Sequence, residues 1–116
     1  MAKRVRKLIE WVGASLEDVR AFPQDARVAA GKELERVQWG GQPRDFKPLK
    51  TVGSGVYEIR VHTRLEHRLV YVAKFEEAIY VLHAFEKRTR KTPQRDIDIA
   101  ARRLAEVLRQ RPQRAL

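Results

Sequence analysis

The side chains best suited to chemistry in this sequence are cations that lie on or next to strand-like segments. They are Arg60, Arg68, Lys87, Arg88, Arg90 and Lys91. An arginine side chain binds a phosphate group through two parallel hydrogen bonds, and preorganised donors stabilise the charge that develops in a transition state. Arginines grouped over a sheet surface are therefore suited to binding a phosphodiester and stabilising a pentavalent phosphorus transition state. A solvated sheet face with ordinary ion pairs, for example between Glu58 and Arg68, accounts for the same residues equally well.

Two titratable side chains accompany these cations and are the possible acid and base. Glu58 is either a general base or a charge partner, and His62 is either a general acid or an exposed histidine. His83 lies in an apolar segment, where a histidine is more often a core residue with satisfied hydrogen bonds than a catalyst. The remaining cations that we assign to polyanion binding are Lys47, Lys50, Arg90 and Arg95.

The overall charge of the chain points to an anionic partner. Of its 116 residues, 25 are Lys or Arg and 15 are Asp or Glu, which gives a formal net charge of +10. Such an excess on a small chain favours nucleic acid, an acidic protein or an anionic membrane as partner. Because most of the clustered cations are arginines, which suit phosphate better than lysines do, nucleic acid is the preferred interpretation.

Several classes of site are disfavoured. The sequence has no cysteine, which excludes disulfides, thiol catalysis and cysteine-ligated zinc. His62, His67 and His83 lack the close helical spacing of a zinc site. The segment Gly53-Ser54-Gly55 is too short for a phosphate-binding loop and is better interpreted as a turn, and no serine lies in a nucleophile elbow. We therefore expect neither a metal nor a cofactor, and a conventional hydrolase is disfavoured.

The same composition bears on localisation. The absence of cysteine fits a reducing cytoplasm. The basic start carries an apolar stretch that is short and interrupted by Glu10, unlike a signal peptide, and no apolar run approaches the roughly 20 residues of a membrane span. We expect a cytoplasmic protein that does not engage a membrane.

Three consecutive strands are predicted to position the cations. They cover residues 53–62 and 68–72, and a third strand begins at residue 79 and runs into the basic segment 87–91. In the first strand Tyr57, Ile59 and Val61 alternate with Glu58, Arg60 and His62, which predicts one buried and one wet face. The hairpin loops are expected at Glu66-His67 and Glu76-Glu77. Arg60 and Arg68 would then lie on adjacent antiparallel strands near their hairpin.

The rest of the chain predicts helices around this sheet. A strand over 5–12 is followed by a short helix that starts at a capping box on Ser15 and stops before Pro23. A second helix covers 23–38, with Pro23 as its first residue, and ends at Gly40-Gly41. Residues 42–52 are predicted to connect this helix to the first of the three strands. The last helix starts with Thr92 as N-cap and Pro93 as first helical residue and stops before Pro112, leaving a frayed tail.

This pattern predicts one α+β domain over residues 1–116. Its antiparallel sheet would be backed by an N-terminal helical hairpin and a C-terminal helix. The aromatic residues Trp11, Trp39, Tyr57 and Tyr71 are assigned to the core rather than to base stacking.

The three strand segments resemble those of a known family. The residues concerned are Gly55 to Val61, Arg68 to Tyr71, and Val81 to Pro93. They are similar to the RelE/ParE toxin superfamily, and most of all to its HigB-like, phage-related branch, in which a basic, threonine-rich segment ending in proline precedes the last helix. The resemblance covers nearly the whole chain.

The resemblance implies a RelE-like fold and a toxin of a bacterial type II toxin–antitoxin pair. Such toxins typically bind the 70S ribosome and cut mRNA in its A site without a metal. The RNA's own 2′-hydroxyl attacks the adjacent phosphate and leaves a cyclic phosphate. By position, Arg60, Arg68, Lys87, Arg88 and Lys91 would be the catalytic cations. Where members have a lysine two residues before the Arg60 position, this chain has Glu58.

The resemblance also implies partners and alternatives. A cognate antitoxin is expected, acidic where it contacts the toxin, and a helix-turn-helix protein is one type that it could be. Two other functions remain open: a ParE-like inhibitor of DNA gyrase without a nuclease site, and an RNA-binding module without catalysis. The cationic face favours RNA over gyrase, because gyrase inhibition requires no cationic active site.

Overall fold

The computed structural model of the chain describes residues 5–111. Its elements are β1 (Leu8–Trp11), α1 (Ser15–Arg20), α2 (Gln24–Gln38), β2 (Phe46–Pro48), β3 (Val56–His62), β4 (Glu66–Val72), β5 (Ala78–Glu86) and α3 (Gln94–Gln110). The strands form one five-stranded sheet in the order β1-β5-β4-β3-β2. The predicted α+β class, the helical pair near the start and the helix at the end are confirmed. The frayed tail predicted from residue 112 lies outside the described residues.

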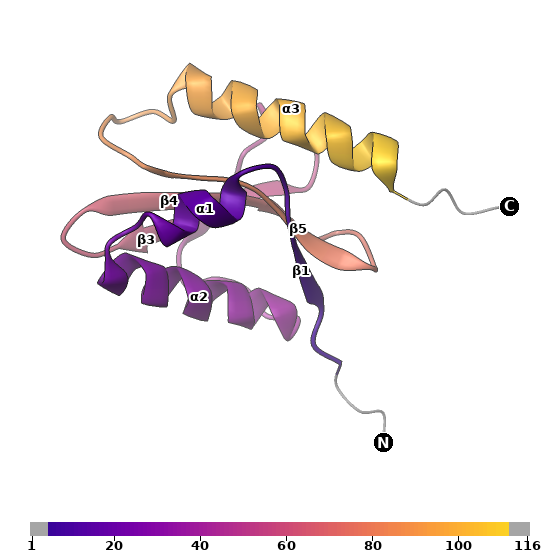
Figure 1. Cartoon of the computed structure of the whole chain (residues 1–116), viewed down its shortest axis with the longest axis horizontal. Coiled ribbons are helices and arrows are strands. Elements are labelled where there is room, and N and C mark those ends of the chain that lie inside the picture. Colours follow the sequence, from indigo (N-terminus) through magenta and orange to yellow (C-terminus); the bar gives the residue numbers. More distant parts are fainter. Residues whose placement is uncertain (1–4, 112–116) are drawn as a thin grey trace, which may run out of the picture.

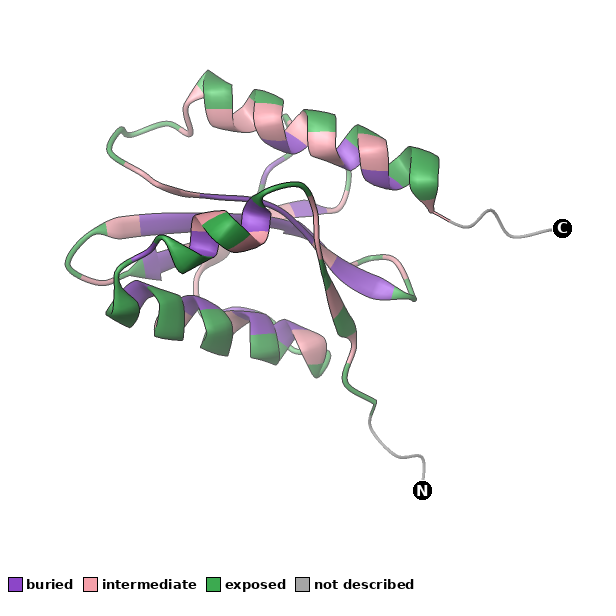
Figure 2. Ribbon diagram, in the orientation of Figure 1, coloured by how far each residue is buried: buried purple, intermediate pink, exposed green. Residues whose placement is uncertain are grey.

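The sheet is the middle of three layers (Figure 1). The helices α1 and α2 cover one face and α3 covers the other, and each face has its own apolar core. Ile59, Val61 and Leu69 pack towards α1 and α2, whereas Val70 and Val72 pack towards α3. Figure 2 shows this as buried residues along the strands and on the inner sides of the helices. The predicted alternation of β3 is therefore real, but its second face is also partly covered.

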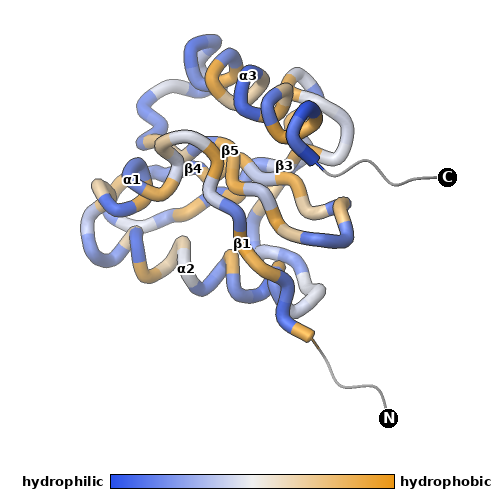
Figure 3. Tube along the Cα trace, turned by 45° about the vertical axis from the view of Figure 1, so that its right-hand side comes forward, coloured by the Kyte–Doolittle hydropathy of each residue, from blue (hydrophilic) through white to orange (hydrophobic). Residues whose placement is uncertain are grey.

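The helices carry the apolar stripes that this layering requires. In α2 the buried positions are Ala26, Ala30, Leu34 and Val37, and in α3 they are Ala100, Leu104 and Val107. Such three- and four-residue steps place one apolar stripe against the sheet, and Figure 3 shows apolar and polar residues alternating along α3. Leu108 follows Leu104 at the same four-residue step but is 54% exposed. No helix within residues 5–111 is long and apolar enough to cross a bilayer.

The sheet is mixed rather than antiparallel throughout. The meander β3-β4-β5 is antiparallel as predicted, but β1 pairs with β5 in parallel, with Leu8 beside Ala78 and Trp11 beside Val81. A tight turn forces neighbouring strands to run antiparallel, whereas a long connection does not. The chain leaves β1 through two helices, so nothing local fixes its direction. The strand is also shorter than the predicted 5–12.

Two boundaries differ from the predictions in ways that matter for the site. The segment 42–52, predicted as a connection, contains the edge strand β2, which pairs Lys47 with Glu58. The first hairpin loop spans only residues 63–65, so Glu66 and His67 belong to β4. His67 is 1% exposed, with its ring centroid 4.2 Å from that of Phe22. Burial lowers the pKa of His67. The loop predicted around Glu76-Glu77 is confirmed.

Three of the predicted helix caps are replaced by other arrangements. Pro23 and Pro93 are N-cap residues with extended backbone (ψ 153° and 145°), one position earlier than predicted. Ser15 is the first residue of α1, fully buried, and makes no capping hydrogen bond. The end of α2 at Gly40 is confirmed, since Gly40 has φ +87°, a conformation that glycine adopts without steric cost. Gly55 at φ +76° likewise confirms the predicted turn before β3.

Candidate nucleic-acid interface

Arg60 and Arg68 lie directly opposite each other on β3 and β4. Directly opposed residues of an antiparallel pair share one face of the sheet, so the two side chains leave the sheet on the same side, as predicted. Their environments differ, because 34% of the Arg60 side chain is exposed and only 7% of the Arg68 side chain. Arg60 is therefore accessible at the surface, while Arg68 lies beneath it.

Glu58 does not lie on an open surface, and that prediction was wrong. Its side chain is fully buried. Glu58 Oε2 accepts a hydrogen bond of 2.7 Å from Thr92 Oγ1, and Oε1 lies 3.5 Å from Arg68 Nε and 3.9 Å from Lys47 Nζ. The burial arises because the segment 87–93, between β5 and α3, folds back onto this face of β3. The expected ion pair between Glu58 and Arg68 is present.

Lys87 joins this cluster from the end of β5. Its backbone N–H donates a 2.8 Å hydrogen bond to the Glu66 carbonyl oxygen. Burial, and then the nearby Arg68 guanidinium, lower the pKa of the Lys87 ammonium, with smaller contributions from Lys47 and Arg60. Glu58 opposes these effects and raises the pKa of Lys87, so Lys87 lies near the buried carboxylate that Lys47 and Arg68 contact directly.

His62 is held between two carboxylates at the edge of the cluster. Its Nδ1 lies 2.8 Å from Glu66 Oε1 and its Nε2 lies 2.5 Å from Asp45 Oδ2. The hydrogen bonds to Asp45 and Glu66 raise the pKa of His62, and they lower the pKa of both carboxyl groups. Asp45 also contacts Arg60 (3.5 Å to Nη1), and Glu66 contacts Arg68 (3.0 Å to Nη1). The imidazolium form of His62 therefore links the two arginines through carboxylates.

The other predicted cations are exposed. They are Lys50, Arg88, Arg90, Lys91 and Arg95. Arg88 is bound to Glu86. Arg90 and Lys91 lie in the segment 87–93 and Arg95 in the first turn of α3, so all three border the cluster. Lys50 does not join it, because β2 runs antiparallel to β3 and carries Lys50 beyond Val56, at the opposite end of the strand from Arg60.

Sequence reasoning missed three residues that hold the cluster together: Asp45, Glu66 and Thr92. Had β4 been predicted to start two residues earlier, Glu66 would have faced His62 across the hairpin. Thr92 was assigned to a helix cap, which its hydroxyl does not provide. No signal in the sequence pointed to Asp45, because the strand that follows it was not predicted.

The histidine and the aromatic residues assigned to the core behave as expected with one exception. His83 is buried and its Nε2 lies 2.7 Å from Asp96 Oδ1. Tyr71 lies in the core, where burial raises its pKa to about 12, and Tyr57 and Trp11 are partly buried and pack against the core. Trp39 is the exception, since 42% of it is exposed.

Comparison with known protein families identifies the family to which the chain belongs. Residues 17–105 match the model of a family described as phage derived protein Gp49-like (DUF891). No curated protein matches the sequence. The match covers most of the chain, which therefore belongs to the Gp49-like family, known from toxin–antitoxin systems for RelE-like toxins.

Proposed function

We propose that this member of the Gp49-like family is the toxin of a type II toxin–antitoxin pair and an endoribonuclease that cuts mRNA on the 70S ribosome. The observation that carries the proposal is the pairing of Arg60 and Arg68 on one sheet face, with Lys47 and Lys87 beside them. A net charge of +10 would favour RNA as ligand. The family match supports the toxin class; the ribosome and the cleavage reaction belong to the proposal.

The proposed reaction needs no metal. The 2′-oxygen of the RNA forms a bond to the adjacent phosphorus while the bond from phosphorus to the 5′-oxygen breaks, which leaves a 2′,3′-cyclic phosphate and a 5′-hydroxyl. Negative charge accumulates on the nonbridging oxygens, and donors held in place before the reaction stabilise it. Arg60 would bind the phosphate at the surface, and Arg68 and Lys87 would supply the remaining positive charge.

Proton transfer is assigned from the hydrogen bonds of His62 and from the burial of Lys87 beside Arg68. The hydrogen bonds to Asp45 and Glu66 raise the pKa of His62 and so favour its imidazolium form, which suits an acid that protonates the leaving 5′-oxygen. A phosphate bound to Arg60 would compete with Asp45 Oδ1 for that guanidinium, and His62 Nε2 would exchange its contact with Asp45 Oδ2 for one with the leaving 5′-oxygen. Lys87, whose pKa is lowered by burial and by Arg68, is assigned as the base that accepts the 2′-hydroxyl proton. Glu58 is buried and positions Arg68 and Thr92.

The test is cleavage of a defined mRNA by purified protein with translating ribosomes, with and without EDTA. We expect cuts in register with codons and products ending in a cyclic phosphate. Arg60→Ala should lower the rate roughly 10²–10³-fold, as loss of one preorganised donor does. Arg109→Ala, which removes the same charge from the last turn of α3, should keep the rate. Wild-type cleavage by Arg60→Ala would contradict the site.

The role of Lys87 has its own comparison. Arginine keeps the positive charge but does not lose its proton in proteins. Lys87→Arg should therefore be as inactive as Lys87→Ala if the amine is the base. Activity of Lys87→Arg near wild type would assign Lys87 to charge stabilisation alone.

The same assay separates the two alternative functions. Intact mRNA together with blocked DNA supercoiling would identify a gyrase inhibitor. Intact mRNA with salt-sensitive RNA binding and no effect on supercoiling would identify a binding module.

A further inference from the structure

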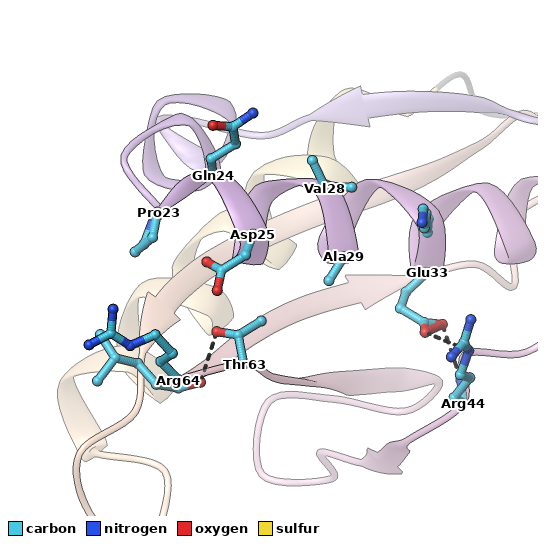
Figure 4. A pocket seen from close by; sticks show the side chains of 11 residues that line it. Pro23, Gln24, Asp25, Val28, Ala29, Glu33, Arg44, Thr63 and Arg64 are labelled. Atoms are coloured by element: carbon cyan, nitrogen blue, oxygen red, sulfur yellow. Dashed lines mark hydrogen bonds and ion pairs between the residues drawn. The ribbon is translucent and has the colours of Figure 1, made fainter.

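The carboxylates of Asp45 and Glu66 reach His62 from two separate segments of the chain. A groove of about 1100 Å³ lies beside α2, with Arg44 at one end and Arg64 of the β3–β4 turn at the other (Figure 4). Asp45 directly follows Arg44, and Glu66 is the first residue after the turn. The two carboxylates are therefore held by different parts of the fold, and a ligand can displace one without the other.

Glu66 is held firmly on its side of the imidazole. It pairs with His62 in the register of the hairpin. The turn between them is closed by hydrogen bonds of 3.0 and 3.3 Å from the Thr63 N–H and hydroxyl to the Leu65 carbonyl oxygen (Figure 4). Glu66 Oε1 also accepts a 3.0 Å hydrogen bond from Nη1 of Arg68, whose side chain is only 7% exposed. Because leaving would deprive a buried guanidinium of one of its partners, we expect Glu66 to stay in place.

Asp45 is fixed by its backbone, whereas its carboxylate contacts only surface groups. Its carbonyl oxygen accepts a 2.9 Å hydrogen bond from the Arg60 N–H, and the preceding Arg44 is bound to Glu33 of α2 (Figure 4). The side chains of Arg60 and His62 are 34% and 51% exposed, and that of Asp45 is 39% exposed. Exposed side chains change rotamer quickly, so the carboxylate can rotate away while the backbone around it stays in place.

The Asp45 carboxylate occupies the position that an RNA phosphate would take. Its Oδ1 lies 3.5 Å from Arg60 Nη1 and its Oδ2 lies 2.5 Å from His62 Nε2. An RNA phosphodiester also carries one negative charge, and it would present a nonbridging oxygen to Arg60 and its 5′-oxygen to His62. The two groups therefore exclude each other. Glu66 contacts the other ring nitrogen, Nδ1, at 2.8 Å, so a phosphate at Nε2 leaves that contact intact.

We propose that these two carboxylates have opposite effects on the reaction. Asp45 substitutes for the RNA phosphate in the free protein and restrains the site until RNA displaces it. Glu66 is a positioning residue that holds the imidazole by Nδ1 while Nε2 faces the leaving 5′-oxygen. The inference rests on the proposed function, because it assigns RNA as the ligand that displaces Asp45. It adds a restraint supplied by the chain itself, which anions that bind too weakly to displace Asp45 do not release.

The first experiment measures binding of a short 2′-O-methyl RNA, which lacks the free 2′-hydroxyl and is not cut. Asp45→Asn should bind about fivefold more tightly than wild type, because two partly exposed ion contacts no longer have to be broken. Glu35→Gln removes the same charge from an exposed position on α2, at the other face of the sheet, and should bind within about twofold of wild type.

Fluorescence anisotropy at pH 6 measures these affinities. That pH is below the ordinary imidazole pKa of 6.5 and favours the imidazolium form of His62 in every variant. Equal affinity of Asp45→Asn and Glu35→Gln for the RNA would overturn the restraint.

A second measurement requires no substitution. The imidazole ¹⁵N resonances of His62 in the wild-type chain are followed while the same RNA is added. The Nε2 resonance should shift as Asp45 is displaced, and the Nδ1 resonance should stay near its position because Glu66 remains bound. An Nε2 resonance that does not move at saturation would overturn the displacement of Asp45, and equal shifts of both nitrogens would overturn the role of Glu66.

Cleavage of ribosome-bound mRNA separates the two roles, with each variant measured at the pH of its highest kcat. Asp45→Asn should lower KM and keep kcat within about twofold of wild type, because the carboxylate has already left the site in the complex. Glu66→Gln should lower kcat about tenfold or more, as loss of the carboxylate that orients a catalytic imidazole does. Equal losses of kcat would show that Asp45 also positions His62 and would overturn the restraint. Wild-type kcat in Glu66→Gln would overturn its positioning role.

These outcomes distinguish the inference from the proposed function. If Asp45→Asn binds the 2′-O-methyl RNA more tightly but neither it nor wild type cuts mRNA, the nuclease function fails and the restraint by Asp45 stands. If mRNA is cut and Asp45→Asn binds RNA like Glu35→Gln, only the restraint fails.

Discussion

At the scale of single residues, the main feature of the site is a buried ion pair between Glu58 and Arg68. Both side chains are almost fully buried and their closest atoms are 3.5 Å apart. Neither Glu58 Oε1 nor Arg68 Nε has a hydrogen-bond partner in the described part of the chain, so the ion pair is what compensates these two buried atoms. Removing one member of such a pair leaves an uncompensated buried charge. Arg68 is therefore both part of the proposed catalytic surface and part of what holds it together.

This ion pair predicts that a second substitution restores much of the stability that the first one removes. Arg68→Met should lower the free energy of unfolding by about 3–5 kcal/mol, because Glu58 then lacks its partner. Glu58→Gln combined with Arg68→Met should recover much of that loss, since no buried charge remains. Arg60→Ala should melt close to wild type, because Arg60 is partly exposed. Urea unfolding of wild type, Glu58→Gln and these three variants checks this, and additive losses in the double mutant would contradict the pairing.

His62 predicts a defined pH dependence of stability. Its folded pKa is raised, so its contribution is complete below the ordinary value of 6.5 and is lost as pH rises through the folded pKa. Asp45 and Glu66 have lowered values, so theirs is complete above the ordinary 3.8 and 4.5 and is lost as pH falls through the folded values. The window in which all three contribute is pH 4.5 to 6.5.

The stability difference between wild type and His62→Gln should be largest in that window and shrink at higher pH. Urea midpoints of both proteins between pH 4 and 9 measure it. Arg60 and Arg68, which contact the two carboxylates, keep their charge over this range and do not confound the profile. A difference that stays constant from pH 5 to 9 would show that His62 is not held as an imidazolium.

At the scale of elements, α3 fixes the segment 87–93 because the helix is attached at both ends. Near its start, Asp96 binds His83 on β5. At its end, Arg111 binds Glu77 in the β4–β5 loop, and its guanidinium carbon lies 3.7 Å from the Phe75 ring centroid. The segment between β5 and α3 is thus held over the sheet, and the hydrogen bond from Thr92 to Glu58 attaches it there.

The hydrogen bond from the Thr92 hydroxyl to Glu58 is expected to keep the basic segment 87–93 in one conformation. Thr92→Val keeps the shape and removes the hydrogen bond to Glu58, which should cost about 1.5–3 kcal/mol, the range for hydrogen bonds to charged groups. Amide hydrogen exchange in residues 87–93 should become faster. Thr92→Ser keeps the hydroxyl and should restore both values towards wild type. Slow exchange of that segment in Thr92→Val would show that the backbone bond from Lys87 to Glu66 suffices to hold it.

At the scale of the whole molecule, one group of cations lies around the start of α3 and on the sheet face beneath it. The exposed cations of the segment 87–93 and of the first turn of α3 surround the buried cluster, whereas Arg109 is in the last turn, at the far end of the helix. A polyanion should therefore bind at one end of α3, where these charges meet.

This asymmetry predicts a site-specific salt effect. Binding of a short single-stranded RNA should weaken steeply as salt rises, with a slope of about −0.7 for each phosphate neutralised. Arg90→Ala should reduce that slope by roughly one phosphate's share, and Arg109→Ala should leave it unchanged. Fluorescence anisotropy over a salt series measures both. Equal slopes for the two variants would mean that the chain attracts RNA by net charge alone.

The sequence by itself determined the α+β class, the meander, and the placement of Arg60 and Arg68 on one face, because period-two alternation and hairpin register are local properties. It did not determine the parallel β1, the strand β2 or the burial of Glu58. Alternation says which side of a sheet a residue lies on but not what later covers that side. Three features combine residues that are far apart in the chain. They are the segment 87–93 that folds back and buries Glu58, the two carboxylates that hold His62, and the groove beside α2. Only the packing of the three layers decided them.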